Sequence, residues 1–393
     1  MDGFLICSSA TSNATPDSPV IFTVIGTVVP GHKPSKCAGA PWNGRNICLE
    51  VMTGGQFPDE EGDLTELDAC VPVECVSVFA SVESKTGQAT KTIVITHAVP
   101  PGAHRRVKGS DLALNQPLVL AGQRILSSHL LPLLSAGIET MSVVARPRVG
   151  IWSTGNEFVS DASNARTDIN GPYLTALCRN FDADPVFLGY LDDTKEDLAR
   201  EIKNTAETGN FDILVTTGAV SAGKFDFVRP ALISCGADIV FHGVDIRPGH
   251  PMLFAYLPSN RSADAIAFFG LPGNPGASAA CFRFLLVPFL RQMQLRDPER
   301  PVLAQATRQG KECRDQEIYR GSAIFSSRKL NDCFLLGHLT STSDGRNVVE
   351  VCTEVSSAKL KPFISANCWV HVYPSCSLLD GEMAECYPLT PVS

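Results

Sequence analysis

Residues 213–223 read ILVTTGAVSAG, an apolar run typical of a strand that is followed at once by a glycine turn. Similar turns occur at TGN (154–156) and LPGNP (271–275), each after an apolar run, and the turn RPGHP occupies 247–251. In α/β sheets, a strand that ends in a glycine turn before a helix presents backbone N–H groups to an anionic ligand. The pattern therefore predicts an α/β domain with an anion-binding edge.

The segments around this stretch alternate between strand and helix periodicity. The predicted strands are 148–152, 185–191, 213–216 and 266–269, and the predicted helices are 170–181, 194–205 and 275–293. Thr194 and Asp197 have the spacing of a capping box at the start of the second helix. With right-handed crossovers, this order predicts a central, mostly parallel sheet with helices on both faces.

Both flanks of the α/β segment are rich in predicted strands. They are 21–29, 75–79 and 92–95 before it, followed by a helix near 123–136, and 319–325, 333–336, 348–352 and 369–373 after it. The helix has Leu126, Leu130, Leu133 and Leu134 on one face. We predict a multidomain α/β protein: residues 1–145 with an inserted β-rich module at about 20–100, the α/β domain at 146–298, and a small C-terminal β-module at 299–393.

Composition excludes several classes of protein. The net charge of −8 argues against a broad surface for nucleic acid or anionic membranes. The longest apolar helix, near 277–290, contains Arg283 and Pro288, which makes it a poor membrane span, and the first residues lack a basic signal-peptide region. The fourteen cysteines are scattered without a C-x-x-C pair, so we expect reduced thiols, no zinc site and a cytoplasmic protein.

Several motifs recur together in one order along the chain. They are DGF (2–4), MTGG (52–55), 106–111, TGNE (154–157), DINGP (168–172), GAVSAGKFD (218–226), RPGHP (247–251), LPGNP (271–275) and SAN (365–367). In this combination the chain resembles the molybdopterin molybdenumtransferases, a family that includes bacterial MoeA and the E domain of gephyrin. The resemblance spans nearly the whole chain.

The resemblance implies a molybdenum insertase of molybdenum cofactor biosynthesis. Such an enzyme takes adenylylated molybdopterin and molybdate, inserts the metal at the dithiolene sulfurs and cleaves the adenylyl phosphoanhydride to release AMP, assisted by Mg²⁺. It also implies a homodimer, a small-molecule pterin substrate and a separate molybdopterin adenylyltransferase as a partner. Two alternatives stay open: a molybdopterin adenylyltransferase or related nucleotide-handling enzyme, and a scaffold or ligand-binding homologue that has lost turnover.

Carboxylates are the expected Mg²⁺ ligands and catalytic groups, because this ion prefers carboxylate oxygens and water. By resemblance they are Glu157, Asp192 and Asp226, with Asp111 as a further catalytic residue. The first three lie at or beyond predicted strand ends, where the sites of open α/β sheets gather. Asp193 could replace Asp192, and either could instead cap the following helix. Asp168 is expected to cap the helix that begins near Asn170.

Substrate contacts are assigned by the same resemblance. The residues are Asp2, Thr53, Gly218, Ser221, Gly223, Lys224, His242, Arg247, His250, Pro272 and Pro275. Cations and backbone N–H groups would hold molybdate and phosphate. The alternatives are a simple turn at Thr53, a surface ion pair for Arg247, satisfied core positions for both histidines, and a rigid turn around Asn274, whose side chain would cap the next helix.

The chain departs from the family pattern at two places. The family more often has lysine where this chain has His242 and His250, and histidine is largely neutral at pH 7, so we expect AMP release to fall more steeply between about pH 6 and 8 than in a lysine-bearing relative. The resemblance also starts at Met1, whereas relatives have a further N-terminal segment. We expect the chain as given to be less stable or less well dimerised than an extended form.

Overall fold

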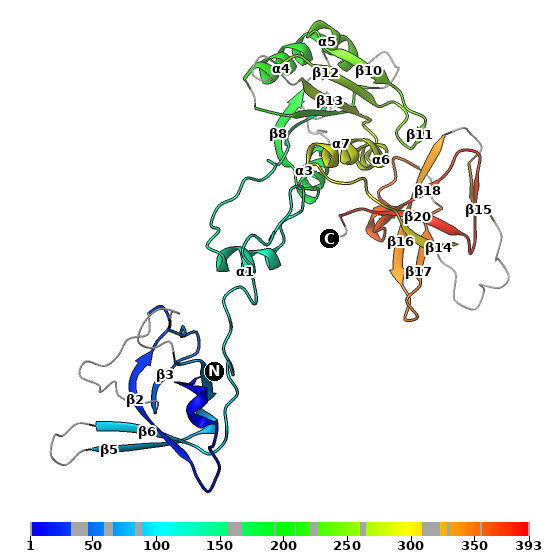
Figure 1. Ribbon diagram of the computed structural model, residues 1–393. Helices are drawn as coiled ribbons and strands as arrows, with labels where there is room; N and C mark the ends of the chain where they lie inside the picture. The colour runs from blue at the N-terminus through cyan, green and yellow to red at the C-terminus, as the bar shows by residue number, and fades with distance from the viewer. Residues whose placement is uncertain are drawn as a thin grey trace. The chain divides into compact units, whose positions relative to one another are not determined.

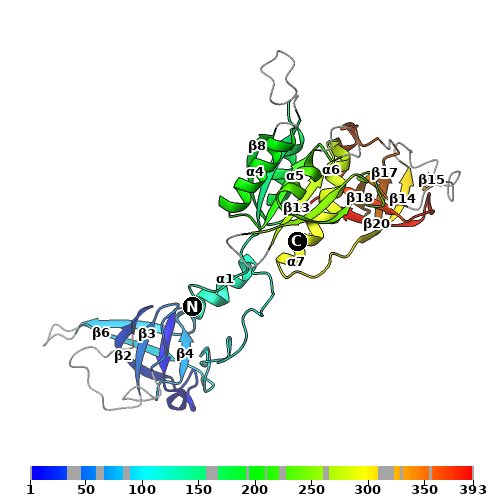
Figure 2. The same ribbon diagram turned by 90° about the horizontal axis from the view of Figure 1, so that it is seen from above.

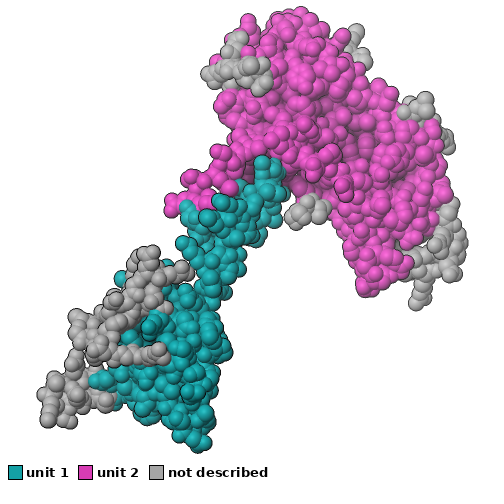
Figure 3. All heavy atoms as spheres, viewed as in Figure 1, with its two compact units in different colours: residues 1–137 teal, residues 138–393 magenta. Residues whose placement is uncertain are grey.

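The structure, a computed structural model, describes most of the chain. The described residues are 2–32, 46–58, 66–82, 89–155, 167–191, 194–208, 210–220, 227–259, 265–308, 323–327, 331–353 and 356–391. They divide into two compact units, residues 1–137 and residues 138–393 (Figure 3). The predicted domain limits at residues 145 and 298 stay a prediction.

The first unit contains a sheet with the strand order β4-β1-β3-β2-β6-β5. Figure 1 labels β2, β3, β5 and β6 of this sheet. Its elements are β1 (Gly3–Ile6), the 3-10 turn η1 (Ser8–Thr11), β2 (Val20–Val28), β3 (Ile47–Val51), β4 (Ala69–Pro72), the 3-10 turn η2 (Val73–Cys75), β5 (Ser77–Val82), β6 (Ala89–Ile95) and helix α1 (Ser127–Ser135). Phe4, Phe22 and Ile93 are buried in its core. β1, β3 and β4, each four or five residues long, lie outside the predicted strands.

Helix α1 lies within the predicted range 123–136, but its apolar face stays open. Leu133 is buried, whereas Leu126, Leu130 and Leu134 are at least half exposed. The described residues of the first unit therefore leave most of this face uncovered.

The second unit begins with an α/β part whose strand order is β10-β12-β13-β9-β7-β8. Its elements are β7 (Arg148–Thr154), α3 (Asn170–Asn180), β8 (Asp184–Leu191), α4 (Lys195–Thr208), β9 (Ile213–Thr217), α5 (Val228–Ser234), β10 (Asp238–His242), β11 (Ile246–Arg247), β12 (Leu253–Leu257) and β13 (Ile266–Leu271). Strands β8, β7, β9 and β13 run parallel, and β12 and β10 extend the sheet antiparallel. The sheet is mixed.

Helices cover the sheet through two separate apolar cores. On one face, Leu174 of α3 and Phe282 pack with Val215 of β9. Against the other face, Leu198 of α4 and Leu232 of α5 pack with Phe268 of β13. Helices α4 and α5 lie together on this side of the sheet in Figure 2. Because both faces are buried, these strands are apolar along most of their length instead of alternating with polar residues.

Thr194 and Asp197 bond to each other at the start of α4. Thr194 Oγ1 donates to Asp197 Oδ2 at 2.6 Å and accepts the Asp197 N–H at 3.3 Å. Thr194 therefore caps the helix as the spacing predicts, but the return bond of a capping box, from the Thr194 N–H to the Asp197 carboxylate, is not among the hydrogen bonds of the described residues.

The predicted long helix at 275–293 is confirmed, with an irregular centre. It consists of α6 (Pro275–Cys281), one π-helical stretch η3 (Phe282–Leu286) and α7 (Val287–Met293). Pro288 has no N–H, and its ring disfavours a regular turn around the carbonyl of Phe284. A widened turn at this point lets the helix continue through the proline.

The C-terminal β-module follows in the same unit. Its elements are β14 (Val302–Arg308), β15 (Ala323–Ser326), β16 (Asp332–Ser341), β17 (Asn347–Val351), the 3-10 turn η5 (Lys361–Ile364), β18 (Cys368–Val372), β19 (Ser377–Leu379) and β20 (Met383–Pro388). The order is β11-β16-β17-β14-β20-β18, and an additional β16–β18 pairing closes the sheet on itself. The first residues of the predicted strand 319–325 lie outside the described residues. Strand β11, from the α/β part, pairs with β16 and joins the two parts of this unit.

Candidate active site

The carboxyl ends of the parallel strands meet at one edge of the α/β sheet. Thr154 of β7 pairs with Leu191 of β8, and Ser153 pairs with Thr217 of β9. Thr217 in turn pairs with Leu271 of β13. Ligand sites of open α/β sheets form outside such strand ends, so this edge is the first part of a candidate site.

Hydrogen bonds lock the turns at this edge together. The amide of Asn170, at the start of α3, donates from Nδ2 to Thr217 Oγ1 at 2.9 Å and to the Gly273 carbonyl at 2.8 Å. The Gly218 N–H donates to the Leu271 carbonyl at 2.9 Å. Gly218 has φ of 102°, and a Cβ there would lie 2.7 Å from Thr154 Oγ1. A glycine is therefore required where β9 ends.

Asp168 has the capping role predicted for it. Its Oδ1 accepts the N–H groups of Asn170 and Gly171 at 3.0 and 3.1 Å, and its Oδ2 accepts a hydrogen bond from Ser153 Oγ at 2.7 Å. The carboxylate is buried and fixes the start of α3 against β7. Asp168 thus joins the start of α3 to β7.

Several predicted site residues fall outside the described residues. They are Glu157, Asp192, Ser221, Gly223, Lys224 and Asp226. In the sequence they follow β7, β8 and β9, the strands whose ends share the edge. Their assignments stay predictions.

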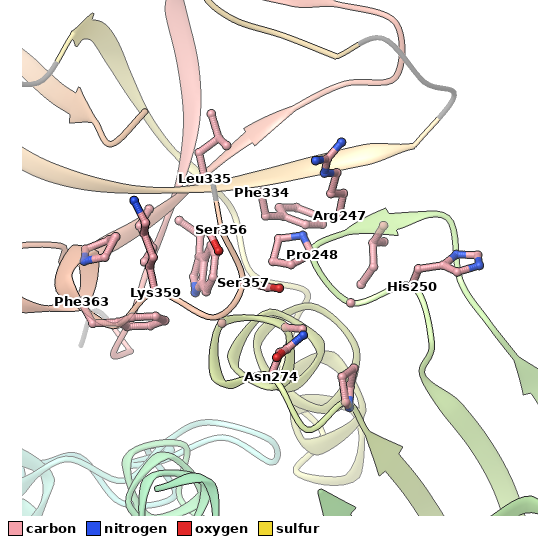
Figure 4. Close-up of a pocket in the computed structure, with 18 of the residues that line it drawn as sticks. Arg247, Pro248, His250, Asn274, Phe334, Leu335, Ser356, Ser357, Lys359 and Phe363 are labelled. Atoms are coloured by element: carbon pink, nitrogen blue, oxygen red, sulfur yellow. The ribbon is translucent and has the colours of Figure 1, made fainter. Parts of the chain in front are cut away.

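A pocket of about 380 Å³ lies beside this edge, between the α/β part and the C-terminal β-module (Figure 4). The α/β part contributes the turn at 247–251, Pro272 and the start of α6, and the β-module contributes Phe334, Ser357 and Trp369. Pro272 and Asn274 flank Gly273, whose carbonyl accepts from Asn170, so the pocket is continuous with the strand-end edge. Its volume is within the range of small-molecule sites.

Basic residues line the pocket on both walls. Arg247 and His250 come from the α/β part, and Lys359 comes from the β-module. In Figure 4 the imidazole of His250 points away from Ser357 and Lys359. Its Nδ1 donates to the Val244 carbonyl at 2.7 Å, so a neutral ring has no further proton to donate to an anion. The structure thus joins Arg247 and His250 in one pocket but directs the histidine ring elsewhere.

His242 ends β10 and is not among the described residues that line this pocket. Its Nε2 donates to the carbonyl of Val220 at 3.1 Å, in the turn after β9. Both histidines therefore bind main-chain carbonyls, but neither occupies the core position of the alternative, because His242 is half-buried and His250 is exposed.

The proline turn before α6 differs in one respect from its prediction. Pro275 is in the first helical turn, as predicted, and Asn274 holds the N-cap position. The side chain of Asn274 makes no capping bond to the described residues of α6. The Asn274 side chain faces the pocket in Figure 4. One of the first N–H groups of α6 is instead bonded by the β-module: the Gly276 N–H donates to the Ser357 carbonyl at 2.9 Å.

The sequence gives no indication of the pocket wall formed by Ser356, Ser357 and Lys359. These residues belong to neither a strand nor a glycine turn, and they lie about eighty residues after the turn at 271–275 and more than a hundred after the turn at 247–251. The nearby SAN motif at 365–367 is the one signal that could point to this region.

Two further predicted residues, Asp2 and Thr53, bind each other in the first unit. Asp2 Oδ1 accepts the Thr53 N–H at 2.7 Å and a hydrogen bond from Thr53 Oγ1 at 2.9 Å. The hydrogen bond from the Thr53 N–H, and to a smaller extent the one from its hydroxyl, hold the pKa of Asp2 below its usual value. The Gly55 N–H closes a main-chain turn onto the Met52 carbonyl at 2.8 Å, and the role of the Thr53 hydroxyl toward a ligand stays a prediction.

The Asp2 contact predicts a pH dependence of stability. A carboxylate whose pKa is lowered by folding stabilises the folded state above its unfolded pKa, and this contribution is lost as the pH falls through the folded value. We expect Asp2→Asn to reduce the urea midpoint at pH 6, and the difference from the parent protein to shrink below about pH 4. Asp17→Asn, at an exposed carboxylate of the same unit, is the control. An equal difference at both pH values would contradict the prediction.

Asp111, the remaining predicted catalytic residue, is exposed in the first unit. Its described ion-pair partner is Arg106, at 4.0 Å between Nη1 and Oδ2, and both side chains are more than four-fifths exposed. Screening by water makes such a pair weak. The catalytic role of Asp111 stays a prediction.

Within the described residues, no group of three or more His, Cys, Asp or Glu side chains is arranged to hold a metal ion. The predicted metal ligands Glu157, Asp192 and Asp226 are not among them. The described helices include none that is long and apolar enough to cross a membrane.

Two family models match the chain. The probable molybdopterin binding domain matches residues 150–292, and the MoeA N-terminal region (domain I and II) matches residues 1–137. The first range contains the strand-end edge and the start of α6, and the second covers the first unit.

Known proteins are similar over most of the chain. A molybdopterin molybdenumtransferase of Synechococcus elongatus is 30% identical over 323 residues, which cover 80% of this chain and 74% of the relative. A molybdopterin molybdenumtransferase of Bacillus subtilis is 28% identical over 309 residues, covering 78% and 66%. The crystal structure of the molybdopterin biosynthesis moea protein from Pyrococcus horikosii has the same fold, with a TM-score of 0.72 and 24% identity, covering 100% of this chain and 87% of that one. The chain therefore belongs to the molybdopterin molybdenumtransferase family.

Proposed function

We propose that the protein is a molybdenum insertase of molybdenum cofactor biosynthesis. It would take adenylylated molybdopterin and molybdate, insert the metal at the dithiolene sulfurs and cleave the adenylyl phosphoanhydride, with release of AMP. The observation that carries this proposal is the pocket with basic side chains on both walls, continuous with the strand-end edge through the Pro272–Asn274 turn. One continuous site could hold an oxyanion beside a phosphate-bearing pterin.

Glu157, Asp192 and Asp226 are proposed as the groups that hold Mg²⁺. They follow β7, β8 and β9, and the register of these strands brings their ends next to one another. Carboxylate oxygens are the donors that Mg²⁺ prefers, so the donor set fits this ion. When bound, Mg²⁺ would neutralise charge on the phosphoanhydride.

The chain's own residues would bind and orient the two substrates. The N–H groups of the glycine turn that begins at Gly218, together with Ser221, Gly223 and Lys224, are proposed to hold phosphate or the pterin. Arg247 and Lys359 are proposed to attract molybdate from opposite walls, because charged donors bind oxyanions more strongly than neutral ones. Pro272 and Pro275 would keep the turn between them rigid.

A homodimer is part of the proposal. The exposed leucines of α1 support it, because an apolar helix face that the described residues of its unit do not cover is suited to a protein interface. Sedimentation at micromolar concentration would test it. A separate adenylyltransferase as the supplier of adenylylated molybdopterin and a cytoplasmic location also remain proposals.

One assay separates the possible functions. The protein is incubated with adenylylated molybdopterin and Mg²⁺, with and without molybdate, and AMP is measured. Molybdate-dependent AMP supports the insertase. Consumption of ATP with free molybdopterin would instead indicate an adenylyltransferase, and binding of the pterin without turnover would indicate a scaffold; either result overturns the proposal.

Lys359 offers a direct test of the molybdate pocket. We expect Lys359→Ala to raise the KM for molybdate roughly tenfold to a hundredfold, because a hydrogen bond to a charged group contributes about 1.5–3 kcal/mol. Lys359→Arg should keep most of the affinity. Lys361→Ala removes an equally exposed lysine that does not line the pocket and serves as the control. The same KM in the Lys359→Ala and Lys361→Ala variants would show that Lys359 does not contact the oxyanion.

A further inference from the structure

One wall of the pocket is a loop of the β-module that is anchored at three points. We call residues 356–367 the wall segment. Just before it, the Cys352 N–H donates to the Leu336 carbonyl of β16 at 2.9 Å. In its first part, the Ser357 carbonyl accepts the N–H of Gly276 from α6 at 2.9 Å. Its last residue, Asn367, returns to β16. The wall segment therefore connects the β-module to the α/β part across the pocket.

Asn367 fixes the end of the wall segment with its side chain. Its Oδ1 accepts the Leu339 N–H at 2.7 Å, and its Nδ2 donates to the Leu339 carbonyl at 2.8 Å. Its own N–H donates to the Gly337 carbonyl at 3.0 Å. The amide thus satisfies both main-chain groups of Leu339, much as a neighbouring strand would. His338 adds a bond from Nδ1 to the Ser365 carbonyl at 2.6 Å.

Gly276 fixes the other end by close approach. A Cβ at this position would lie 2.9 Å from the Ser357 carbonyl oxygen and 3.2 Å from the Ser357 Cα. Both atoms belong to the backbone, so no rotation of a side chain could relieve the overlap. Any larger residue at 276 must push Ser357 away from α6, and Lys359 is only two residues further along the chain.

We propose that Gly276 and Asn367 are positioning residues that hold Ser357 and Lys359 in the pocket and thereby set its affinity for the oxyanion. Asn367 is not among the residues that line the pocket, and Gly276 lines it with backbone atoms alone, so both act through the wall segment. The inference rests on the proposed function of the pocket. A displacement of about 1 Å in a binding group far from the reacting atoms can reduce activity by up to a hundredfold.

Gly276→Ala and Asn367→Ala test the proposal in the full-length chain. Alanine is favoured over glycine in a helix, so Gly276→Ala should keep α6 folded while displacing the wall segment. We expect the KM for molybdate to rise roughly tenfold in both variants. The KM for adenylylated molybdopterin, and kcat at saturating molybdate, should stay within about twofold, since the strand-end edge is unchanged. A purely structural role would lower kcat through loss of folded protein and leave both KM values unchanged.

Asn347→Ala is the matched control. Asn347 also joins strands of the β-module through its amide, accepting from Ser341 Oγ at 2.9 Å and donating to the Leu303 carbonyl at 3.3 Å, but it does not line the pocket. The KM of the Asn347→Ala variant for molybdate should match that of the parent protein. His338→Ala, which removes only the bond to the Ser365 carbonyl, should give a smaller rise in this KM and provides a second variant if Asn367→Ala does not fold.

The outcomes distinguish the inference from the function on which it rests. If the parent protein releases no AMP in response to molybdate, the proposed function fails. If the parent is active but Gly276→Ala keeps its KM for molybdate, or loses kcat at an unchanged KM, the positioning role is overturned.

Discussion

Replacing Arg283 with methionine is expected to lower the free energy of unfolding by about 3–5 kcal/mol, because it leaves a partner carboxylate unpaired in a poorly solvated position. Arg283 lies in the π-helical stretch, and its side chain is 5% exposed. Its Nη2 lies 2.8 Å from Glu299 Oε2, and its Nε donates to the Pro388 carbonyl at 3.0 Å. One side chain thus joins the long helix, the connection to the β-module and strand β20.

Aromatic rings surround the same guanidinium. Its Cζ lies 5.5 Å from the ring centre of Phe181, 5.8 Å from that of Phe284 and 5.6 Å from that of Tyr387. Burial lowers the pKa of Arg283, and the Glu299 carboxylate opposes this change. In this poorly solvated position, the charge of Arg283 is therefore stabilised by the Glu299 carboxylate, and the carboxylate by the guanidinium.

Urea unfolding of the single and double variants measures this dependence. The double variant R283M/E299L should recover most of the loss, because replacing both members of a buried ion pair by apolar residues is often neutral. Arg200→Met, which breaks an exposed pair with Asp197, should cost at most about 1 kcal/mol. A loss for Arg283→Met no greater than that for Arg200→Met would refute the prediction.

Replacing Asp192 and Asp193 together with asparagine is expected to reduce molybdate-dependent AMP release about a hundredfold or more, the size typical of losing one electrostatic group in an active site. Both residues are changed because either could supply the carboxylate. They directly follow β8, whose last residue, Leu191, pairs with Thr154 at the end of β7. The Mg²⁺ concentration needed for half-maximal activity should rise as well, because a carboxylate ligand is removed.

Asp184→Asn is the matched control on the same strand. Asp184 is an exposed carboxylate at the amino end of β8, at the opposite edge of the sheet. Its loss should leave AMP release and the Mg²⁺ requirement unchanged. If the D192N/D193N variant behaves like Asp184→Asn in both measurements, the carboxylates after β8 have no role in the reaction.

Local signals in the sequence predicted much of the α/β part. The caps from Thr194 and from Asp168 depend on residues a few positions apart, and both are present. The long helix is recognisable by its length, and the strands at 148–152 and 213–216 are recognisable as apolar runs that lead into glycine turns. Strands β1, β3 and β4 lie outside the predicted strands.

The sequence alone determined the family resemblance, the α/β part and the turns that end its strands, since each of these depends on neighbouring residues. Only the tertiary structure decided which residues complete the pocket. Lys359 and Ser357 are far from Arg247 in the chain, and the sheet closure and the Gly276 contact bring them opposite it. Arg283 shows the same dependence: in the sequence it interrupts an apolar helix, and in the fold it is a buried partner of Glu299. Contacts between distant segments have no local periodicity, so folding has to bring them together before they can be recognised.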